Sequence, residues 1–229
     1  MKKRIILMTM LIGAGMFAQA QQKTSPVGRT SFGIRAGVNF QNITGKDENG
    51  NKLENDLLTG FNAGINVEIP VAPQFYIQPG VLYTIKGAKS KDVILGQNIN
   101  GTLSIAYVEV PLNFIFRPLL GSGHLLLGFG PYVAFGVGGK SKYEGGGSSM
   151  SEDIVFKKDV KAGDAGNVVY IKPMDAGANM LFGYEFANKV SFQLNAQLGL
   201  TEINPTYEGS SVGQSSQKNT GFGFSIGYR

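Results

Sequence analysis

One stretch of the sequence carries the residue types of a phosphate-binding loop. It runs from Gly136 to Ser141 and ends in Gly-Lys-Ser. The phosphate-binding motif also needs a glycine five residues before that triplet, where this chain has Ala134, and a helix directly after it. The glycine-rich residues that follow do not favour a helix. The sequence therefore predicts no phosphate site here.

A second stretch, Asp47 to Asn51, has the acidic and amide residues of a calcium loop. In a helix–loop–helix calcium site the glycine stands at the sixth position and a glutamate closes the loop at the twelfth. Here Gly50 stands at the fourth position and no glutamate closes the loop. An Asn-Gly turn is the better prediction, although the nearby carboxylates could bind calcium adventitiously.

The chain has one histidine, His124, and no cysteine. A lone histidine excludes metal sites built from several histidines, and the lack of thiols excludes disulfides and thiolate metal sites. A hydrolase of the Ser-His-acid type would have to use His124. We predict no catalytic residue, no metal site and no cofactor.

Eight charged residues stand in segments that are otherwise poor in charge. Four are basic and four are acidic, which predicts that they form a balanced network in a buried interior, since unpaired charges there would be costly. The basic residues are Arg35, Lys86, Arg117 and Arg229, and the acidic residues are Glu68, Glu109, Asp175 and Glu185.

The elements that must position these charges are β-strands. In Phe75–Gly87, apolar residues alternate with mostly polar ones, which is the pattern of a strand with two different faces. A tilted strand needs about 9–11 residues to cross a bilayer, and this segment is long enough. Seven further segments alternate in the same way: Ser31–Asn42, Thr59–Ile69, Thr102–Arg117, His124–Gly138, Met174–Phe186, Lys189–Thr201 and Thr220–Arg229.

The connections between these segments alternate in length. Long polar links (residues 43–58, 88–101, 139–172 and 202–219) alternate with short ones (residues 70–74, 118–123 and 187–188). An even number of strands with alternating short and long links is typical of outer-membrane proteins. The fold class predicted is all-β: an eight-stranded antiparallel up-and-down transmembrane β-barrel with short periplasmic turns and long extracellular loops.

Glycines and prolines refine this prediction. Many glycines, such as Gly37 and Gly130, fall on the polar face, where small residues leave room for long side chains inside a narrow barrel. Pro79, Pro111 and Pro131 stand in the middle of strands, where proline removes a hydrogen-bond donor. We expect bulges or missing hydrogen bonds at these prolines.

The N-terminus indicates export. Lys2, Lys3 and Arg4 precede a short apolar core and the small-residue site Ala18-Gln19-Ala20, as in a cleaved signal peptide. We expect a signal peptide over residues 1–20, a flexible periplasmic lead over 21–30, the barrel domain over 31–229, and location in the outer membrane. Removing the signal peptide leaves 18 basic against 16 acidic residues, so the basic pI gives no support for nucleic-acid binding.

Three segments carry a family resemblance: Phe75–Gly87, Val108–Leu112, and Asp175–Phe186 with the later Gly199-Leu200-Thr201. They resemble the PorT-like outer-membrane β-barrel family of Bacteroidetes-type bacteria, which implies an eight-stranded barrel. The name-giving member is associated with a secretion and gliding apparatus, but the matching residues are barrel architecture and do not carry that role over. Such chains commonly end in an aromatic residue that the assembly machinery recognises, and here Tyr228 would serve.

The third long link, residues 139–172, is the best candidate for a binding surface because a loop this long is unusual in a small barrel. We expect Tyr143, Phe156, Lys157 and Lys158 to form that surface and to meet an unidentified protein or glycan, with membrane lipid around the barrel. The run Gly145–Ser149 is expected to be a flexible tip.

Two alternatives remain open at this point. A soluble lipocalin-like periplasmic barrel would place the apolar face inside, around a ligand. An outer-membrane lipid-modifying enzyme would need its reactive groups at the external rim, whereas His124 is expected at the opposite rim.

Overall fold

The computed structural model describes residues 28–47, 49–94, 97–208 and 215–229. The predicted signal peptide and residues 21–27 of the predicted lead lie outside this part of the chain. Within it, no helix has the length and apolar character needed to cross a membrane.

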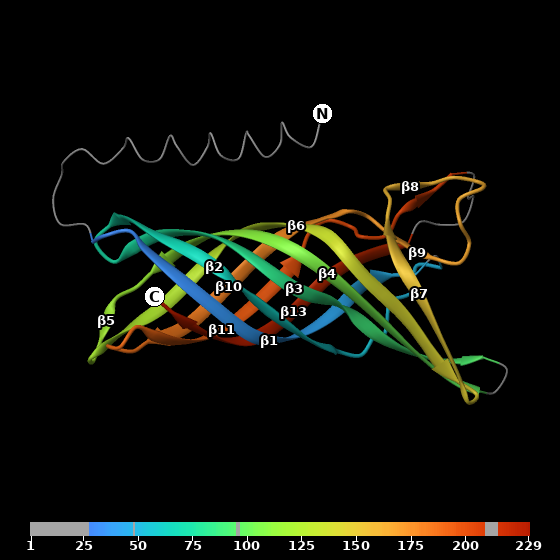
Figure 1. Ribbon diagram of the computed structural model, residues 1–229, viewed down its shortest axis with the longest axis horizontal. Coiled ribbons are helices and arrows are strands. Elements are labelled where there is room, and N and C mark those ends of the chain that lie inside the picture. Colours follow the sequence, from blue (N-terminus) through green and yellow to red (C-terminus); the bar gives the residue numbers. More distant parts are fainter. Residues whose placement is uncertain (1–27, 48, 95–96, 209–214) are drawn as a thin grey trace.

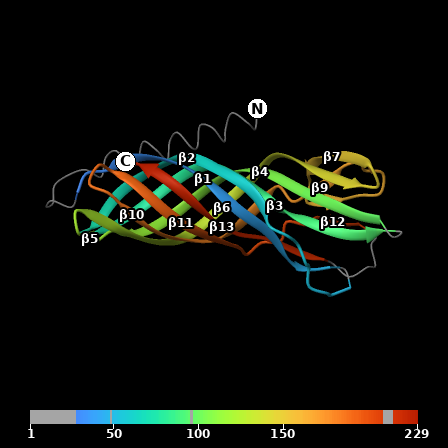
Figure 2. The same cartoon turned by 90° about the horizontal axis from the view of Figure 1, so that it is seen from below.

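Eight long strands form a closed ring in which every neighbouring pair is antiparallel (Figures 1 and 2). The order around the ring is β1, β2, β3, β4, β6, β10, β11, β13 and back to β1. The strands are β1 (Ser31–Lys46), β2 (Leu58–Ala72), β3 (Phe75–Ile94), β4 (Gln97–Phe116), β6 (Gly123–Gly145), β10 (Met174–Glu185), β11 (Val190–Gly199) and β13 (Ser216–Tyr228). All eight predicted strands are confirmed.

The two ends of the ring differ. At one end, here called the turn end, short links join β2 to β3, β4 to β6 and β10 to β11. At the other, here called the loop end, long segments join β1 to β2, β6 to β10 and β11 to β13. The short strands are β5 (Leu119–Leu120), β7 (Ser148–Phe156), β8 (Asp159–Val160), β9 (Val169–Ile171) and β12 (Thr206–Tyr207).

Two of the links predicted as loops are largely strand. Residues 88–94 continue β3 and residues 97–101 begin β4, and the two segments pair, so the expectation of a polar loop there was wrong. In the third link, β6 continues to Gly145 and folds back as β7, with which it pairs antiparallel. Gly146 and Gly147 have φ of 56° and 79°, which a tight turn between two strands requires. The predicted flexible tip is therefore a tight turn, and β9 pairs in parallel with β7 rather than extending β10.

The outer face of the ring is apolar and exposed. Phe32, Phe129 and Met180, for example, are 76%, 63% and 67% exposed. Along β10 exposed and buried residues alternate almost without exception, with Asp175 and Glu185 on the buried side. This is the reverse of a soluble ligand-binding barrel, whose apolar side chains would face inward.

Glycines on the inner face permit close approach of neighbouring strands. A β-carbon on Gly37 would lie 2.2 Å from the carbonyl oxygen of Phe224, and one on Gly130 would lie 2.0 Å from that of Leu112. Both distances are far below a normal contact, so these positions have no room for a side chain. The prediction that such glycines lie inside is confirmed.

The three mid-strand prolines coincide with gaps in strand pairing. Between β2 and β3, pairs occur at Asn66–Gly80 and at Ile69–Ile77 but not between them, where Pro79 lies. Corresponding gaps fall between β3 and β4 at residues 80–81 and 110–111, and between β4 and β6 at residues 112–113 and 130–131. The register is the same on both sides of each gap. Missing pairing is confirmed, whereas the register shifts that mark bulges lie elsewhere, at residues 70–72 and 106–107.

Candidate functional site: the ring interior and the loop end

One group of charges, here called the turn-end cluster, consists of Glu68, Arg117, Glu185 and Arg229. Arg117 Nη1 lies 2.6 Å from Glu68 Oε2, and Arg229 Nη2 lies 2.7 Å from Glu185 Oε1. Arg229 Nε also lies 3.5 Å from Glu68 Oε2, so each arginine and each carboxylate takes part in more than one contact. Two positive and two negative charges make the cluster neutral.

Neutral side chains complete the turn-end cluster. Gln78 Nε2 donates to Glu68 Oε1 at 3.1 Å, and Asn113 Nδ2 donates to Gln78 Oε1 at 3.4 Å. The guanidinium of Arg117 lies 4.0 Å from the centre of the Tyr76 ring, a cation–π contact. Gln78 and Asn113 flank the pairing gaps at Pro79 and Pro131, so side chains supply hydrogen bonds where the strands do not.

A second group, here called the central cluster, consists of Lys86, Glu109 and Asp175. All three side chains are at most 2% exposed. Lys86 Nζ lies 2.9 Å from Glu109 Oε2 and 3.1 Å from Asp175 Oδ2. Since Lys86, Glu109 and Asp175 come from β3, β4 and β10, the cluster ties three strands together through the interior.

Three polar partners of the central cluster were not identified from the sequence. Tyr132 Oη and Asn219 Nδ2 donate to Asp175 Oδ2 at 3.3 and 3.0 Å, and Gln197 Nε2 donates to Glu109 Oε1 at 2.7 Å. The Tyr132 ring also lies 4.0 Å from Lys86 Nζ. Tyr132 and Gln197 lie on the polar face of predicted strands, which is the only signal the sequence offers for them. Asn219 was assigned to the link 202–219, whereas the structure places it in β13.

Arg35 differs from the other seven predicted interior charges. Within the part of the chain that the structure describes, it forms no salt bridge, and its buried Nε has no hydrogen-bond partner. It lines a small polar cavity of about 30 Å³ together with Glu109, Asn39 and Gln197. The central cluster carries two carboxylates and one ammonium, so Arg35 supplies the positive charge that balances it. The eight charges therefore divide into two clusters and one solitary arginine.

The lone histidine lies at the turn end, where His124 Nδ1 is 3.9 Å from Glu185 Oε1. This contact belongs to the rim of the turn-end cluster. Among the residues that the structure describes, no three His, Asp or Glu side chains gather in the manner of a metal site.

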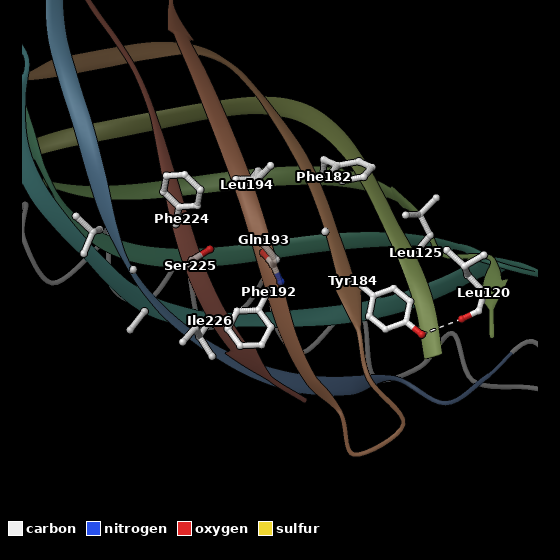
Figure 3. A pocket seen from close by; sticks show the side chains of 14 residues that line it. Leu120, Leu125, Phe182, Tyr184, Phe192, Gln193, Leu194, Phe224, Ser225 and Ile226 are labelled. Atoms are coloured by element: carbon white, nitrogen blue, oxygen red, sulfur yellow. Dashed lines mark hydrogen bonds between the residues drawn. The ribbon is translucent and has the colours of Figure 1, made fainter. Parts of the chain in front are cut away.

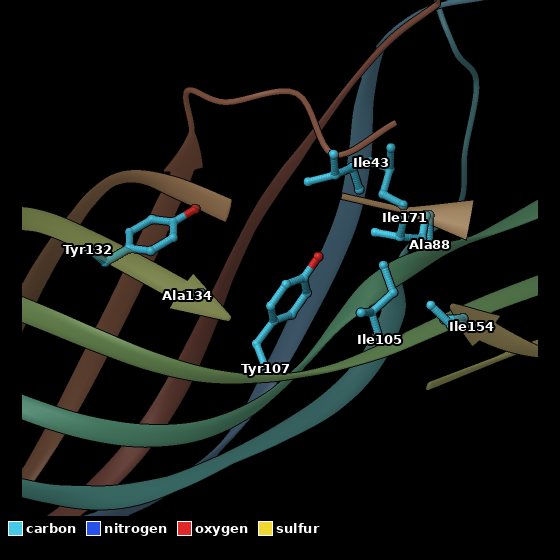
Figure 4. Packing of buried hydrophobic residues seen from close by; sticks show 9 residues of the cluster. Ile43, Ala88, Ile105, Tyr107, Tyr132, Ala134, Ile154 and Ile171 are labelled. Atoms are coloured by element: carbon cyan, nitrogen blue, oxygen red, sulfur yellow. The ribbon is translucent and has the colours of Figure 1, made fainter. Parts of the chain in front are cut away.

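A hydrophobic cluster, here called the loop-end core, closes the interior near the loop end (Figure 4). Tyr107 and Ile105 on β4 and Ile203 from the β11–β13 link are completely buried. The link is held in place because Lys172 N–H donates to the Ile203 carbonyl, and Ile203 N–H donates to the Gln217 carbonyl. The cluster contains Ile43, Ala88, Ile105, Tyr107, Tyr132, Ala134, Ile154, Ile171 and Ile203.

The four residues predicted as a loop surface have different environments. Lys158 is exposed, and Tyr143 is 40% exposed. Lys157 is partly buried and its Nζ donates to Asp164 Oδ1 at 2.6 Å. Phe156 packs against the loop-end core and its ring lies next to Gly136, so this side chain anchors the third link to the ring. The structure thus places three of the four residues where a partner could reach them.

The exposed apolar face of the ring contains a groove of about 690 Å³ over β1, β6, β10, β11 and β13 (Figure 3). Phe182, Phe192 and Phe224 project along it, and Tyr184 Oη donates to the Leu120 carbonyl at 2.8 Å near its turn-end margin. The lining is almost entirely apolar, which suits contact with lipid chains.

Comparison with known protein families identifies the ring of strands as an outer-membrane domain. The family model described as "Outer membrane protein beta-barrel domain" matches residues 17–204. No curated protein sequence matches the chain.

Three solved structures to which the chain is similar have low sequence identity to it. They include Ail of Yersinia pestis in complex with the heparin analogue sucrose octasulfate (14% identity, 88% of this chain and 100% of that chain, TM-score 0.37). Neisserial surface protein A (12%, 88% and 99%, TM-score 0.39) and OprG from Pseudomonas aeruginosa (12%, 86% and 95%, TM-score 0.42) are two more. The family match spans most of the sequence and does not depend on them. The chain belongs to the outer membrane protein beta-barrel domain family, and its location is the outer membrane.

Proposed function

We propose that the protein is a non-enzymatic outer-membrane barrel that binds a partner through its loop end. The observation that carries this proposal is the contrast between a packed interior and an elaborate loop end. Two charge clusters and the loop-end core occupy the interior of the ring. The hairpins β3–β4 and β6–β7 and the short strands β8, β9 and β12 all lie at the loop end.

In this proposal the turn end faces the periplasm and the loop end faces outward, as short turns and long loops do in such barrels. Residues 1–20 would be removed as a signal peptide. The last strand, β13, would present Tyr228 to the assembly machinery. The motifs in β3, β4 and β10 support placement in the PorT-like group, and a role beside an envelope or secretion assembly is compatible with that placement.

The lack of cysteine allows a direct test of orientation. Single variants Lys158→Cys at the loop end and Asn188→Cys at the turn end would be treated on intact cells with a maleimide that cannot cross the membrane. We expect labelling of the Lys158→Cys variant only, and labelling of both after lysis. Labelling of the Asn188→Cys variant alone on intact cells would reverse the proposed orientation.

Partner binding needs a variant that keeps the fold. Removal of the whole third link would delete Ser141 and Ile154, which are buried. A milder change replaces residues 144–149 with Asn-Gly, so that Tyr143 and Met150 remain paired across a short turn, and adds Lys158→Glu. We expect this variant to fold but to lose proteins crosslinked to the wild type on cells. If wild type and variant captured the same proteins, the β6–β7 hairpin would not be part of the binding surface.

A further inference from the structure

A pocket of about 350 Å³ opens at the loop end, above the loop-end core. Its walls come from β1, β3, β4, β6, β9 and β13 and from the β1–β2 and β11–β13 links. Ligand sites usually measure about 300–1,000 Å³, so the size suits a small molecule or a short chain end. Its polar and aromatic lining includes Asn55, Tyr143, Tyr170, Asn204, Tyr207 and Ser215.

The floor of this loop-end pocket is apolar and closed. Ile43, Ala88 and Ile171 belong both to the pocket lining and to the loop-end core, and each is at most 5% exposed. The pocket therefore ends blindly above the interior charge clusters. It is a binding recess and not the mouth of a channel.

Two amide side chains in the wall are fixed by the fold. Asn55 Nδ2 donates to the Ile43 carbonyl at 2.8 Å. Asn204 Nδ2 donates to the Ser215 carbonyl at 2.7 Å, and its Oδ1 accepts from the Gln217 N–H at 3.0 Å. An amide group has two N–H donors and an oxygen with two lone pairs, so both residues keep free capacity in a preset orientation.

Three tyrosine side chains also line the pocket. Tyr143 and Tyr207 are 40% and 53% exposed, so a ligand in the pocket can reach both rings. Tyr170 is held by donation from its hydroxyl to the Ala165 carbonyl at 3.1 Å. Aromatic rings offer flat apolar faces with a polar edge.

The charge of the lining restricts the ligand. Among the described residues that line the pocket, Lys89 is the only charged one and none is a carboxylate. A cation would therefore lack a counter-charge. Lys89 is exposed to solvent, so its ammonium group stays hydrated without an anionic ligand. A purely apolar ligand would bury the amide and hydroxyl groups without partners, which is costly. The chemistry favours a neutral ligand that has both C–H faces and many hydroxyl groups.

We propose that this pocket binds a short neutral saccharide, with sugar rings against the tyrosines and hydroxyl groups on the fixed amides. The inference rests on the proposed function, because it gives the external end of the barrel a ligand class. Tyr143 belongs to both the predicted loop surface and the pocket lining. The two activities are still separable by mutation, since the hairpin variant keeps Tyr143 and changes only residues 144–149 and Lys158, which do not line the pocket.

The test uses the full-length protein in lipid nanodiscs and two neutral probes, maltotriose and N,N′-diacetylchitobiose, by saturation-transfer NMR and calorimetry. We expect saturable binding of at least one probe. Tyr207→Ala should weaken it at least tenfold, and Ser215→Trp should abolish it by filling the pocket from a loop position. Lys142→Ala, at an exposed position on β6 that does not line the pocket, is the matched control and should bind as the wild type does.

Several results would overturn the inference. They are failure of both probes to bind, binding of a sulfated disaccharide but of neither neutral probe, or full binding by the Ser215→Trp variant. If saccharides fail while the hairpin variant still loses a protein partner, the pocket inference falls and the proposed function stands. If saccharides bind while protein capture is unaffected by the hairpin change, the pocket stands and the hairpin surface falls.

Discussion

Lys86 Nζ lies 3.1 Å from Asp175 Oδ2, although the two residues belong to strands that are not neighbours in the ring. β4 and β6 separate β3 from β10, so this ion pair crosses the interior. Glu109 on β4 joins it, and Asn219 on β13 donates to the same carboxylate. The central cluster thus acts as a cross-brace that joins opposite walls of the ring.

Replacing Lys86 with methionine should be strongly destabilising, because Glu109 and Asp175 would both lose the only cation that forms a salt bridge with them among the described residues. Loss of one member of a buried ion pair costs about 3–5 kcal/mol. Urea unfolding of the protein in lipid vesicles would measure it. Lys91→Met is the matched control, since Lys91 pairs with Asp56 on the surface and such pairs contribute at most about 1 kcal/mol. Equal losses in the two variants would contradict the bracing role.

Gly130→Ala should impair folding, because the added methyl group would meet the backbone oxygen of Leu112 at 2.0 Å. Backbone cannot move aside as a flexible side chain can, so a loss of at least about 1–3 kcal/mol is expected from overpacking. Gly138→Ala is the control, because a β-carbon there meets nothing within 4 Å. The gel shift between folded and heat-denatured forms would report the folded fraction. Normal folding of the Gly130→Ala variant would refute the close approach of β4 and β6.

Pro131→Ala should stabilise the ring modestly, because it restores an N–H donor beside the pairing gap between β4 and β6. One additional hydrogen bond contributes about 0.5–1.5 kcal/mol. Amide hydrogen exchange should be faster at residues 112–113 than in the uninterrupted β1–β13 ladder, and slower there in the variant. Pro205→Ala, in a loop, controls for the general effect of removing proline. Protection at residues 112–113 equal to that of the β1–β13 ladder would show that the gap has no energetic consequence.

Acid should loosen the third link before it unfolds the ring. Hydrogen bonds from Lys157 Nζ and from the Lys161 N–H lower the pKa of the Asp164 carboxyl below its ordinary value. A lowered folded-state pKa means that this contribution to loop order is complete above about pH 4, the unfolded-state value, and is lost as the pH falls through the folded-state pKa.

Proteolysis of the link in vesicles, followed between neutral pH and pH 3 with an acid-active protease, would measure this loosening. Asp164→Asn should make the link as susceptible at neutral pH as the wild type is in acid. Asp153→Asn, at an exposed position on β7, should leave the cleavage profile unchanged. A pH-independent cleavage rate in the wild type would contradict the role of Asp164.

An arginine on the outer face should prevent stable insertion. Met180 lies between Phe129 and Ala196 on neighbouring strands and is 67% exposed. A charged residue facing the middle of the bilayer costs about 2–4 kcal/mol. Met180→Arg should lower the unfolding free energy by this amount in vesicles, whereas Leu119→Arg at the turn end should have little effect. No difference between the two variants would argue against a lipid-facing position for Met180.

The sequence was sufficient to predict the eight strands because one face of each is continuously apolar where it meets lipid. This apolar face is not present in the parts of the strands that extend beyond the lipid. Lys89 and Lys91 belong to β3, yet a strand with polar residues on both faces has the pattern of a loop, so residues 88–101 were assigned to one.

The sequence predicted which kinds of residues lie inside the ring, but not which of them contact one another. Alternation places Tyr132 inside, whereas Asn219 precedes the predicted last strand and was assigned to a link. The stagger between strands decides that both side chains meet Asp175. That stagger depends on the register of every pair around the ring, which no short pattern encodes. The parallel pairing of β7 with β9, and with it the loop-end pocket, depends on the same long-range geometry.

The length of β6 determines how far the tip of the β6–β7 hairpin lies from the membrane surface. Its 23 residues measure roughly 75 Å at about 3.3 Å per residue, whereas about ten residues suffice to cross a bilayer. In the proposed orientation more than half of the strand stands outside the lipid, braced by β4 and β7, and Figure 1 shows its hairpin projecting beyond the ring. The hairpin is then a stiff spacer. It holds a bound partner at a fixed stand-off from the lipid and avoids the entropy loss that a flexible tether would incur on binding.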